Sequence, residues 1–452
     1  MLRLRVSDNG RFLVREDGSL FFWMGDTGWA LGTLPPEDVD LYLSHRAQHG
    51  FNVIQMNCTH RRAGHADSEP FLNRDSDTPN EAYWSKVDAL VTRAQEYAIY
   101  LALVPMWGGE YARAFGTDAE QAYRLGRWLG ERYAPQPNVL WISSGEYDSI
   151  NGFVLPITAE QRSLFTALGR GLRDGHGGAN LTTIHPGVAF TSSLDFHQEK
   201  WLDFNMLQSG HENDREAFGH PENYTSIAHD YNLAPTKPVL DGEPFYEDTP
   251  DGIWIHKDTE RPRGGADVVR RKAYWAVLAG AFGHTYGHND MCTFFEPTPP
   301  GQGPAPPLGS AQRYHWKEAL DAPGALQMKR LRALMESHSS VDRIPDQSLL
   351  VSPPGSGLTH LQATRAADGS FALVYLPAGG TVTVDLSRLA GPEATATWFD
   401  PRTGACTEVG TCAGKGERSF TAPGENVLGN DWVLVLAGAR LGDSASGAGR
   451  QR

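Results

Sequence analysis

The stretch Asn138-Val139-Leu140-Trp141-Ile142-Ser143-Ser144-Gly145-Glu146 joins a short apolar, partly β-branched run to a carboxylate at its end. The stretch Lys237-Pro238-Val239-Leu240-Asp241-Gly242-Glu243 repeats this arrangement later in the chain. Short runs of this kind indicate buried parallel strands, and the residues that follow such strands in an α/β barrel meet at one rim. We therefore expect Glu146 and Glu243 to reach the same rim from different strands.

Six more short apolar segments surround these two, and most of them end in polar or aromatic residues. They lie at residues 21–26, 51–57, 101–107, 181–186, 204–209 and 283–289. Helix-compatible stretches separate most of the eight segments, with apolar residues at three-to-four spacing or a nearly continuous apolar composition. The clearest are residues 36–46, 84–97, 118–133 and 270–282. This alternation, from about residue 20 to about residue 335, predicts an α/β fold of the (β/α)8 TIM-barrel type.

The pattern changes after about residue 340, where short alternating runs are separated by Gly, Pro and Asp. These runs lie at residues 348–351, 371–376, 381–386, 394–399 and 431–436. They predict a small antiparallel β-sandwich as a second domain. We expect a catalytic barrel domain over residues 1–340, a β-sandwich over 341–440, and a disordered tail over 441–452, which is too poor in apolar residues to order itself.

The composition limits the class of ligand and the compartment. The chain has 452 residues, a formal net charge of -14 and 4 cysteines. Nucleic-acid binding depends on clustered Lys and Arg, so we expect no nucleic-acid partner, and no apolar run is long enough to predict a membrane span. The first ten residues lack a signal-peptide pattern and cysteines are few, which predicts a cytoplasmic protein. The sequence leaves the oligomeric state open.

Two glutamates that reach one rim from separate strands favour sugar chemistry. A glycosidase needs one carboxyl group that stays protonated to assist the leaving oxygen, and one that stays ionised to attack or stabilise the anomeric carbon. The chain holds 54 Asp and Glu residues, most of which are expected at the surface. A single glutamate at a strand end would therefore be weak evidence, but the same pattern on two strands favours a catalytic pair. Such a pair predicts an oligosaccharide or glycoside as the substrate.

Five motifs resemble those of the apiosidase-like glycoside hydrolases, over roughly residues 10–340. They are Phe-Trp-Met-Gly-Asp-Thr-Gly-Trp at 22–29, Gly-Phe-Asn-Val-Ile-Gln at 50–55, the strand at 141–146, Gln-Ser-Gly-His at 208–211 and Gly-His-Thr-Tyr-Gly at 283–287. Residues 345–437, with Trp-Phe-Asp-Pro-Arg-Thr-Gly at 398–404, resemble the small β domain that follows the barrel in that family and that has been named for collagen binding.

The resemblance implies a retaining glycosidase with the acid/base after the fourth strand and the nucleophile after the seventh. Our strand count places Glu146 and Glu243 at those two positions. For a retaining pair, the two carboxyl groups are expected to lie about 5–5.5 Å apart. Family members often have Gly-Gly-Asp where this chain has Ser144-Gly145-Glu146. The broader clan often has Asn before the acid/base, so another group must here take the role that Asn plays at the sugar 2-hydroxyl.

Further substrate-binding candidates fall at or just past the predicted strand ends. The aromatic candidates for stacking on a sugar are Trp29, Trp107 and Tyr147, and the polar candidates are Asp26, Asn57, His185, Gln208, Tyr286 and His288. Asp26 could hold two sugar hydroxyls or bond the loop at 27–29, and His185 could orient a hydroxyl or cap its strand. We expect Tyr286 to hold the nucleophile by a hydrogen bond. Aromatic residues at 107–111 and 243–246 favour a closed pocket and exo action.

Two alternatives from other classes stay open on the sequence. A metal-dependent hydrolase would use His284 and His288, which are four residues apart, or His60 and His65, although no adjacent Glu of the zincin type is present. A non-catalytic carbohydrate-binding protein would use the barrel as a scaffold. The sequence has no Walker loop, nucleophile elbow or dinucleotide fingerprint, so we expect no cofactor and no metal. The sugar, its linkage and its ring form are left open.

Overall fold

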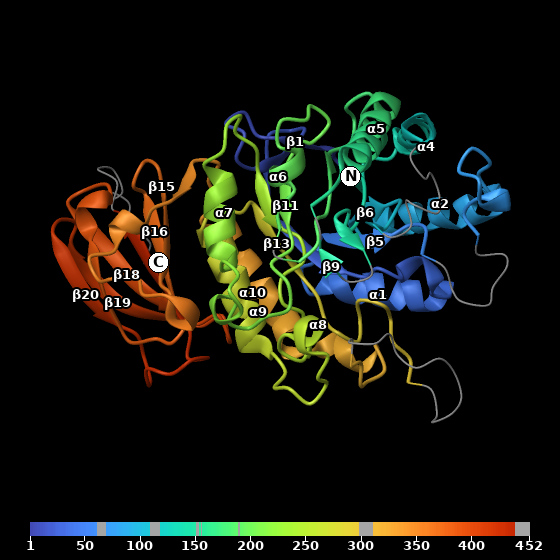
Figure 1. Cartoon of the computed structure of the whole chain (residues 1–452). Coiled ribbons are helices and arrows are strands. Elements are labelled where there is room, and N and C mark those ends of the chain that lie inside the picture. The colour runs from blue at the N-terminus through green and yellow to red at the C-terminus, as the bar shows by residue number, and fades with distance from the viewer. Residues whose placement is uncertain are drawn as a thin grey trace, which may run out of the picture.

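The computed structural model describes residues 1–60, 69–108, 118–150, 153–154, 156–188, 190–297 and 311–438. The larger N-terminal part is built from parallel strands and helices, and the C-terminal part is antiparallel β-sheet (Figure 1). The predicted tail at 441–452 lies outside the described residues. None of the described helices is both long and apolar enough to cross a membrane.

Parallel strands form the centre of the N-terminal part. A six-stranded sheet has the order β10-β7-β6-β5-β4-β13, and a second sheet pairs β11 with β12. Each of the eight predicted segments overlaps one of these strands. In chain order they are β4 (Trp23–Thr27), β5 (Val53–Asn57), β6 (Tyr100–Val104), β7 (Val139–Ile142), β10 (Thr182–Thr183), β11 (Asn205–Leu207), β12 (Val239–Asp241) and β13 (Gly283–Tyr286).

The described helices alternate with these strands and cover their outer face (Figure 1). They are α1 (Pro36–Gln48), α2 (Glu81–Glu96), α4 (Ala119–Tyr133), α5 (Ala159–His176), α6 (Ser193–Phe196), α7 (Asn223–Tyr231), α8 (Ile253–His256), α9 (Ala266–Leu278) and α10 (Pro323–Ser337). The predicted helices at 36–46, 84–97, 118–133 and 270–282 correspond to α1, α2, α4 and α9. A small antiparallel sheet of β1 (Leu4–Val6), β2 (Leu13–Arg15) and β3 (Leu20–Phe21) precedes β4.

Successive residues of the parallel strands enter two different cores, because side chains alternate across a strand. In β7, Leu140 and Ile142 belong to an inner cluster that also takes residues from β4, β5, β6, β11 and β12. Val139 and Trp141 instead pack against the outer helices. An inner cluster shared by strands of both sheets indicates that the strands curve around it, as in a TIM-barrel-like fold.

The C-terminal part is the predicted β-sandwich, with its own core. One sheet has the order β14-β15-β16-β21-β18-β19 and the other pairs β17 with β20. The strands are β14 (Arg343–Pro345), β15 (Gln362–Ala366), β16 (Phe371–Leu376), β17 (Thr381–Asp385), β18 (Glu393–Phe399), β19 (Cys406–Ala413), β20 (Glu417–Thr421) and β21 (Trp432–Gly438). The strand expected at 348–351 is wrong. Residues 347–349 form a 3-10 turn, in which the Asp346 carboxylate accepts the Ser348 N–H, and Leu350 makes an isolated antiparallel bridge to Val384.

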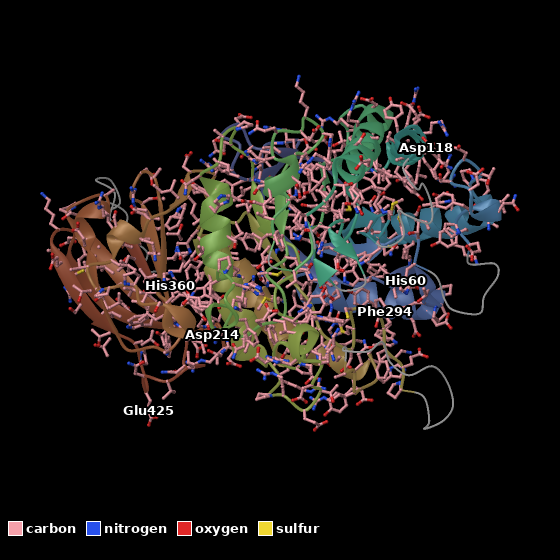
Figure 2. The ribbon with its side chains drawn as sticks, in the orientation of Figure 1. His60, Asp118, Asp214, Phe294, His360 and Glu425 are labelled. Carbon is pink, nitrogen blue, oxygen red and sulfur yellow. The ribbon has the colours of Figure 1, made fainter. Side chains whose placement is uncertain are left out.

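The sandwich packs tightly against α9, α10 and α7. Arg270 of α9 makes a buried bidentate ion pair with Asp431, at 2.9 and 2.6 Å, and the Tyr274 and Tyr375 rings stack at 4.9 Å. His360 stacks on Tyr224 of α7 at 3.8 Å and is labelled at this boundary in Figure 2. One apolar cluster contains residues of α9, α10, β16 and β21. This sheet face is therefore covered by the barrel helices and is not open to another partner.

Candidate active site

Glu146 lies just beyond β7 on a backbone in the left-handed region, with a φ of 42°. This conformation is uncommon for a residue with a side chain and points to a local constraint. The constraint comes from the loop after β6. A Cβ on Gly145 would lie 2.3 Å from the Trp107 ring, and a Cβ on Gly108 would lie 1.9 Å from the Glu146 carbonyl oxygen. Only glycine at both positions lets the two strand ends approach this closely.

The Glu146 carboxylate has a hydrogen-bond donor at each oxygen. The Trp107 indole N–H lies 3.4 Å from Oε2, and the Gln208 amide nitrogen lies 3.4 Å from Oε1. Burial raises the pKa of Glu146, and the negative charge of Glu243 raises it further, against the opposing effect of His185. The Trp107 ring also fills the space beside Gly145, so a side chain at position 145 would clash with it.

Glu243 follows β12 and is 5% exposed. Its backbone is held by neighbouring strands: the Gln55 side chain of β5 donates to the Gly242 carbonyl at 2.8 Å, and the Gly210 N–H donates to the Glu243 carbonyl at 3.1 Å. Its side chain lies between two imidazoles. His185 Nε2 is 3.2 Å from Oε2, and His211 Nε2 is 3.3 Å from Oε1.

Backbone contacts orient both imidazoles. His185 Nδ1 donates to the Pro186 carbonyl at 2.7 Å, and the Tyr246 N–H donates to His211 Nδ1 at 3.4 Å, which leaves the His211 proton on Nε2 toward Glu243. Burial lowers the pKa of His185, but the contact with Glu243 outweighs it and raises the pKa overall. Burial likewise raises the pKa of Glu243, but the contacts with His185 and His211 lower it to about 2.

Aromatic side chains line this part of the rim. Trp29 lies edge-on to Trp107, with ring centroids 4.9 Å apart, and its indole N–H donates to the Tyr246 hydroxyl at 3.2 Å. The His185 ring lies 5.8 Å from Trp29 and 6.0 Å from Trp107. The structure thus brings together six of the predicted site residues. They are Glu146, Glu243, Trp29, Trp107, His185 and Gln208.

Asp26 lies within a buried network of the barrel wall. Its Oδ1 accepts the Thr27 N–H at 2.9 Å, while Oδ2 accepts the Tyr42 hydroxyl at 2.7 Å and Arg46 Nε at 2.5 Å. Asp26 and Arg46 are both fully buried. These contacts correspond to the structural alternative for Asp26, because both of its oxygens accept hydrogen bonds from the chain and its charge balances a buried guanidinium.

Four other candidates make their side-chain contacts away from the two glutamates. The Asn57 side chain accepts from Thr59 at 2.9 Å, and the Tyr147 hydroxyl donates to Asp195 at 3.0 Å. The Tyr286 hydroxyl donates to Glu247 at 2.6 Å, so the carboxylate that it holds is Glu247 and not the expected Glu243. His288 Nδ1 accepts the Asp290 N–H at 3.1 Å, and His288 lines a separate cavity of about 360 Å³ with Glu247.

Sequence reasoning missed two residues of the site. His211 was noted only as part of a motif, and Tyr246 only as part of an aromatic stretch. Burial raises the pKa of Tyr246 well above its usual value, and the charge of Glu243 adds to this effect. The Gly-His step at 210–211 was the available signal for His211, because Gly210 has a φ of 79° and turns the chain back toward Glu243.

Within the described residues, His284 and His288 of the metal alternative belong to no group of three or more possible ligand side chains. Among the described residues, the one group of three possible ligand side chains within 4.8 Å is His45, His49 and Asp321. Arg46 donates to His45 Nδ1 at 3.1 Å, so the His45 proton stays on Nε2 and faces Asp321 at 2.9 Å. This arrangement leaves no free lone pair on His45 for a metal. His65 lies outside the described residues.

The buried His284 makes the stability of the protein depend on pH. It is 1% exposed, neither ring nitrogen has a hydrogen-bond partner within the described part of the chain, and burial lowers its pKa to about 3. The unfolded chain takes up a proton near pH 6.5 and the folded chain does not, so stability falls as the pH drops below 6.5.

Between pH 7.5 and pH 5, we expect wild type to lose about 2 kcal/mol more unfolding free energy than His284→Leu loses. Urea unfolding at the two pH values measures this difference. The exposed His256 provides the control, because His256→Leu should follow wild type. An equal pH dependence in wild type and His284→Leu would contradict the expectation.

Comparisons with known proteins agree with this fold. A family model for the apiosidase-like catalytic domain matches residues 7–342, and a model named for the collagen-binding domain of a collagenase matches residues 344–437. A solved structure titled "Glycoside hydrolase" is 32% identical, covers 97% of both chains and has a TM-score of 0.84. A glycoside hydrolase family 5 structure from Bacteroides vulgatus ATCC 8482 is 31% identical, covers 96% of this chain and 93% of its own, and has a TM-score of 0.83.

A family 5 mannosidase from Rhizomucor miehei shares the fold alone, at 13% identity and a TM-score of 0.53, over 74% of this chain and 98% of its own. The curated proteins gave no match. The family model and the two solved structures above 30% identity define a glycoside hydrolase, whose substrate is a carbohydrate. More narrowly, the chain belongs to the apiosidase-like family.

Proposed function

We propose that this protein is a retaining, exo-acting glycoside hydrolase with Glu243 as the nucleophile and Glu146 as the acid/base. The observation that carries the proposal is the opposite shift of the two pKa values. Two histidines hold the pKa of Glu243 near 2, while burial and the Glu243 charge raise the pKa of Glu146. A pair of carboxyl groups whose environments separate their pKa values is the pattern of an assigned acid and base.

In the first step, a Glu243 oxygen attacks the anomeric carbon and forms a glycosyl ester, and the bond to the leaving oxygen breaks. Glu146 transfers its proton to that oxygen. In the second step, the ionised Glu146 takes a proton from water, and the water oxygen attacks the anomeric carbon. The ester bond breaks, Glu243 leaves as a carboxylate, and Glu146 is protonated again.

The two imidazoles at Glu243 support this cycle. A contact that stabilises the carboxylate keeps Glu243 ionised at neutral pH and also stabilises it as the leaving group of the second step. The same contacts lower the basicity of Glu243, so the two imidazoles should ease its departure more than its attack. His185 also lies near Glu146, whose charge contributes to the raised pKa of His185. When His185 is protonated, its positive charge stabilises the ionised form of both carboxylates.

Exo action and full barrel closure are the finer parts of the proposal. Burial of Glu243 and the close approach of Trp29, Trp107 and Tyr246 suit a pocket that admits one sugar end.

Closure into a (β/α)8 barrel over residues 1–340 is supported at both seams between the two sheets. The Asp203 N–H donates to the Thr182 carbonyl at 2.8 Å, and the Phe282 N–H donates to the Val239 carbonyl at 3.1 Å.

Proton NMR of the hydrolysis products tests the proposal. A panel of nitrophenyl glycosides, furanosides included, identifies a substrate, and the spectrum is recorded before the released sugar mutarotates. We expect the first-formed product to keep the anomeric configuration of the substrate, with the same rate in the presence of EDTA. The opposite anomer would exclude Glu243 as a nucleophile, loss of activity in EDTA would favour metal chemistry, and no turnover of any glycoside would count against exo action on such substrates.

A further inference from the structure

An exposed tryptophan lies close to His211, which contacts Glu243. Trp254 belongs to α8, in the segment that joins β12 to α9, and 40% of its surface is exposed. The next residue, Ile255, is 48% exposed. Scattered apolar residues at a surface need no explanation, but an exposed aromatic side chain beside a functional site is a candidate for ligand contact.

Trp254 is connected to the nucleophile through one imidazole. The Trp254 and His211 rings are 6.5 Å apart with their planes at 45°, and His211 Nε2 lies 3.3 Å from Glu243 Oε1. The backbone fixes this arrangement, because the Gly252 N–H donates to the His211 carbonyl at 2.9 Å. His211 also packs on Tyr246, with ring centroids 4.6 Å apart. Trp254 therefore lies next to the candidate site and not on an unrelated surface.

We propose that Trp254 is the aromatic platform of a second sugar subsite, which holds the sugar unit next to the one at Glu146 and Glu243. This inference rests on the proposed function and names its substrate class as saccharides of two or more units. A flat, partly exposed indole suits the C–H face of a sugar ring. The Lys257 ammonium lies 6.0 Å from the Trp254 ring centre and supplies a donor for sugar hydroxyls.

Steady-state kinetics of Trp254→Ala test the subsite. The substrates are the 4-nitrophenyl monoglycoside that wild type hydrolyses fastest, and gluco-, manno- and xylo-oligosaccharides of two to five units. We expect the ratio of kcat/KM for the oligosaccharide to kcat/KM for the monoglycoside to fall about tenfold in Trp254→Ala, chiefly through KM. Ile255→Ala is the matched control. Ile255 is exposed on the same short helix, but it has no aromatic ring on which a sugar could stack.

Other outcomes would overturn the subsite. An equal loss on both substrates would mean that Trp254 acts only by supporting His211. An unchanged ratio would exclude contact with the second unit. A change from dimer to monomer in size-exclusion chromatography with an unchanged ratio would assign Trp254 to contact between copies of this chain.

Calorimetry separates this inference from the proposed function. The same oligosaccharides are titrated into Glu243→Gln and into Glu243→Gln with Trp254→Ala. Binding by the first variant, weakened about tenfold in the second, supports the subsite even if wild type hydrolyses none of the monoglycosides. Equal binding by both variants, or binding by neither, contradicts it.

Discussion

Glu243→Gln is expected to lower kcat on glycosides by about 10⁵-fold, because the amide keeps the shape of the side chain but cannot form the glycosyl ester. The structure makes this loss specific to the carboxylate. His185 and His211 face its two oxygens, and both imidazoles keep their own backbone contacts when the charge is removed. Rate measurement on the best nitrophenyl glycoside, with a thermal unfolding scan of the same sample, gives the result.

The matched control for this variant is Glu247→Gln. Glu247 is a buried carboxylate four residues further along the chain, and it accepts the Tyr286 hydroxyl at 2.6 Å and the Gly324 N–H at 3.0 Å. We expect Glu247→Gln to lower stability by about 1 kcal/mol and to change kcat far less than Glu243→Gln does. Comparable kcat values for Glu243→Gln and wild type would remove Glu243 from the mechanism.

Glu146→Ala is expected to lower kcat/KM by about 10²–10⁴-fold on substrates with a poor leaving group, because the variant lacks the carboxyl group proposed to protonate the leaving oxygen. A dinitrophenyl leaving group needs no protonation, so that substrate should show a burst of dinitrophenol followed by slow turnover. Azide should restore turnover and yield a glycosyl azide with the anomeric configuration of the substrate. A Glu146→Ala variant that loses as much on the activated substrate, and that azide does not rescue, would contradict the acid/base role.

The pH profile adds an independent check on the two roles. Glu146 must be protonated for the first step and its pKa is raised, so kcat/KM should fall on the alkaline side as Glu146 ionises. Glu243 must be ionised and its pKa is about 2, so the acidic limb should lie well below the ordinary range of a glutamate. In Glu146→Ala the alkaline limb should disappear, and its persistence would assign that limb to another group.

Much of the TIM-barrel-like domain could be predicted because its parallel strands are covered on both faces. Such strands are short, continuously apolar and β-branched, and residues such as Leu101, Leu103 and Trp141 are fully buried accordingly. The sandwich was predicted less well. β19 has mostly exposed side chains and little apolar alternation, so nothing in its composition separates it from a loop.

Whether a predicted site residue reaches the two glutamates depends on the partners that surround its side chain. His185 and Gln208 follow strand ends and reach the glutamates, as expected from their place in sequence. Asp26 also follows the expected pattern, yet Arg46 lies opposite it, and a buried guanidinium needs a carboxylate partner. Tyr286 reaches Glu247 because its side chain lies in the apolar cluster that contains residues of α9 and α10, and not in the inner cluster of the strands. No local pattern reveals which partner a polar side chain finds.

The sequence by itself determined the order of strands and helices, the sandwich that follows them, and the two glutamates at strand ends, because these features depend on local composition and on the period of apolar residues. Only the tertiary structure decided that Trp107 fills the space beside Gly145, that His211 is the second imidazole at Glu243, and that Asp26 balances Arg46. The reason is physical: hydrogen bonds and charge pairs act over a few ångströms, and residues far apart in the chain reach that distance only after the backbone has folded.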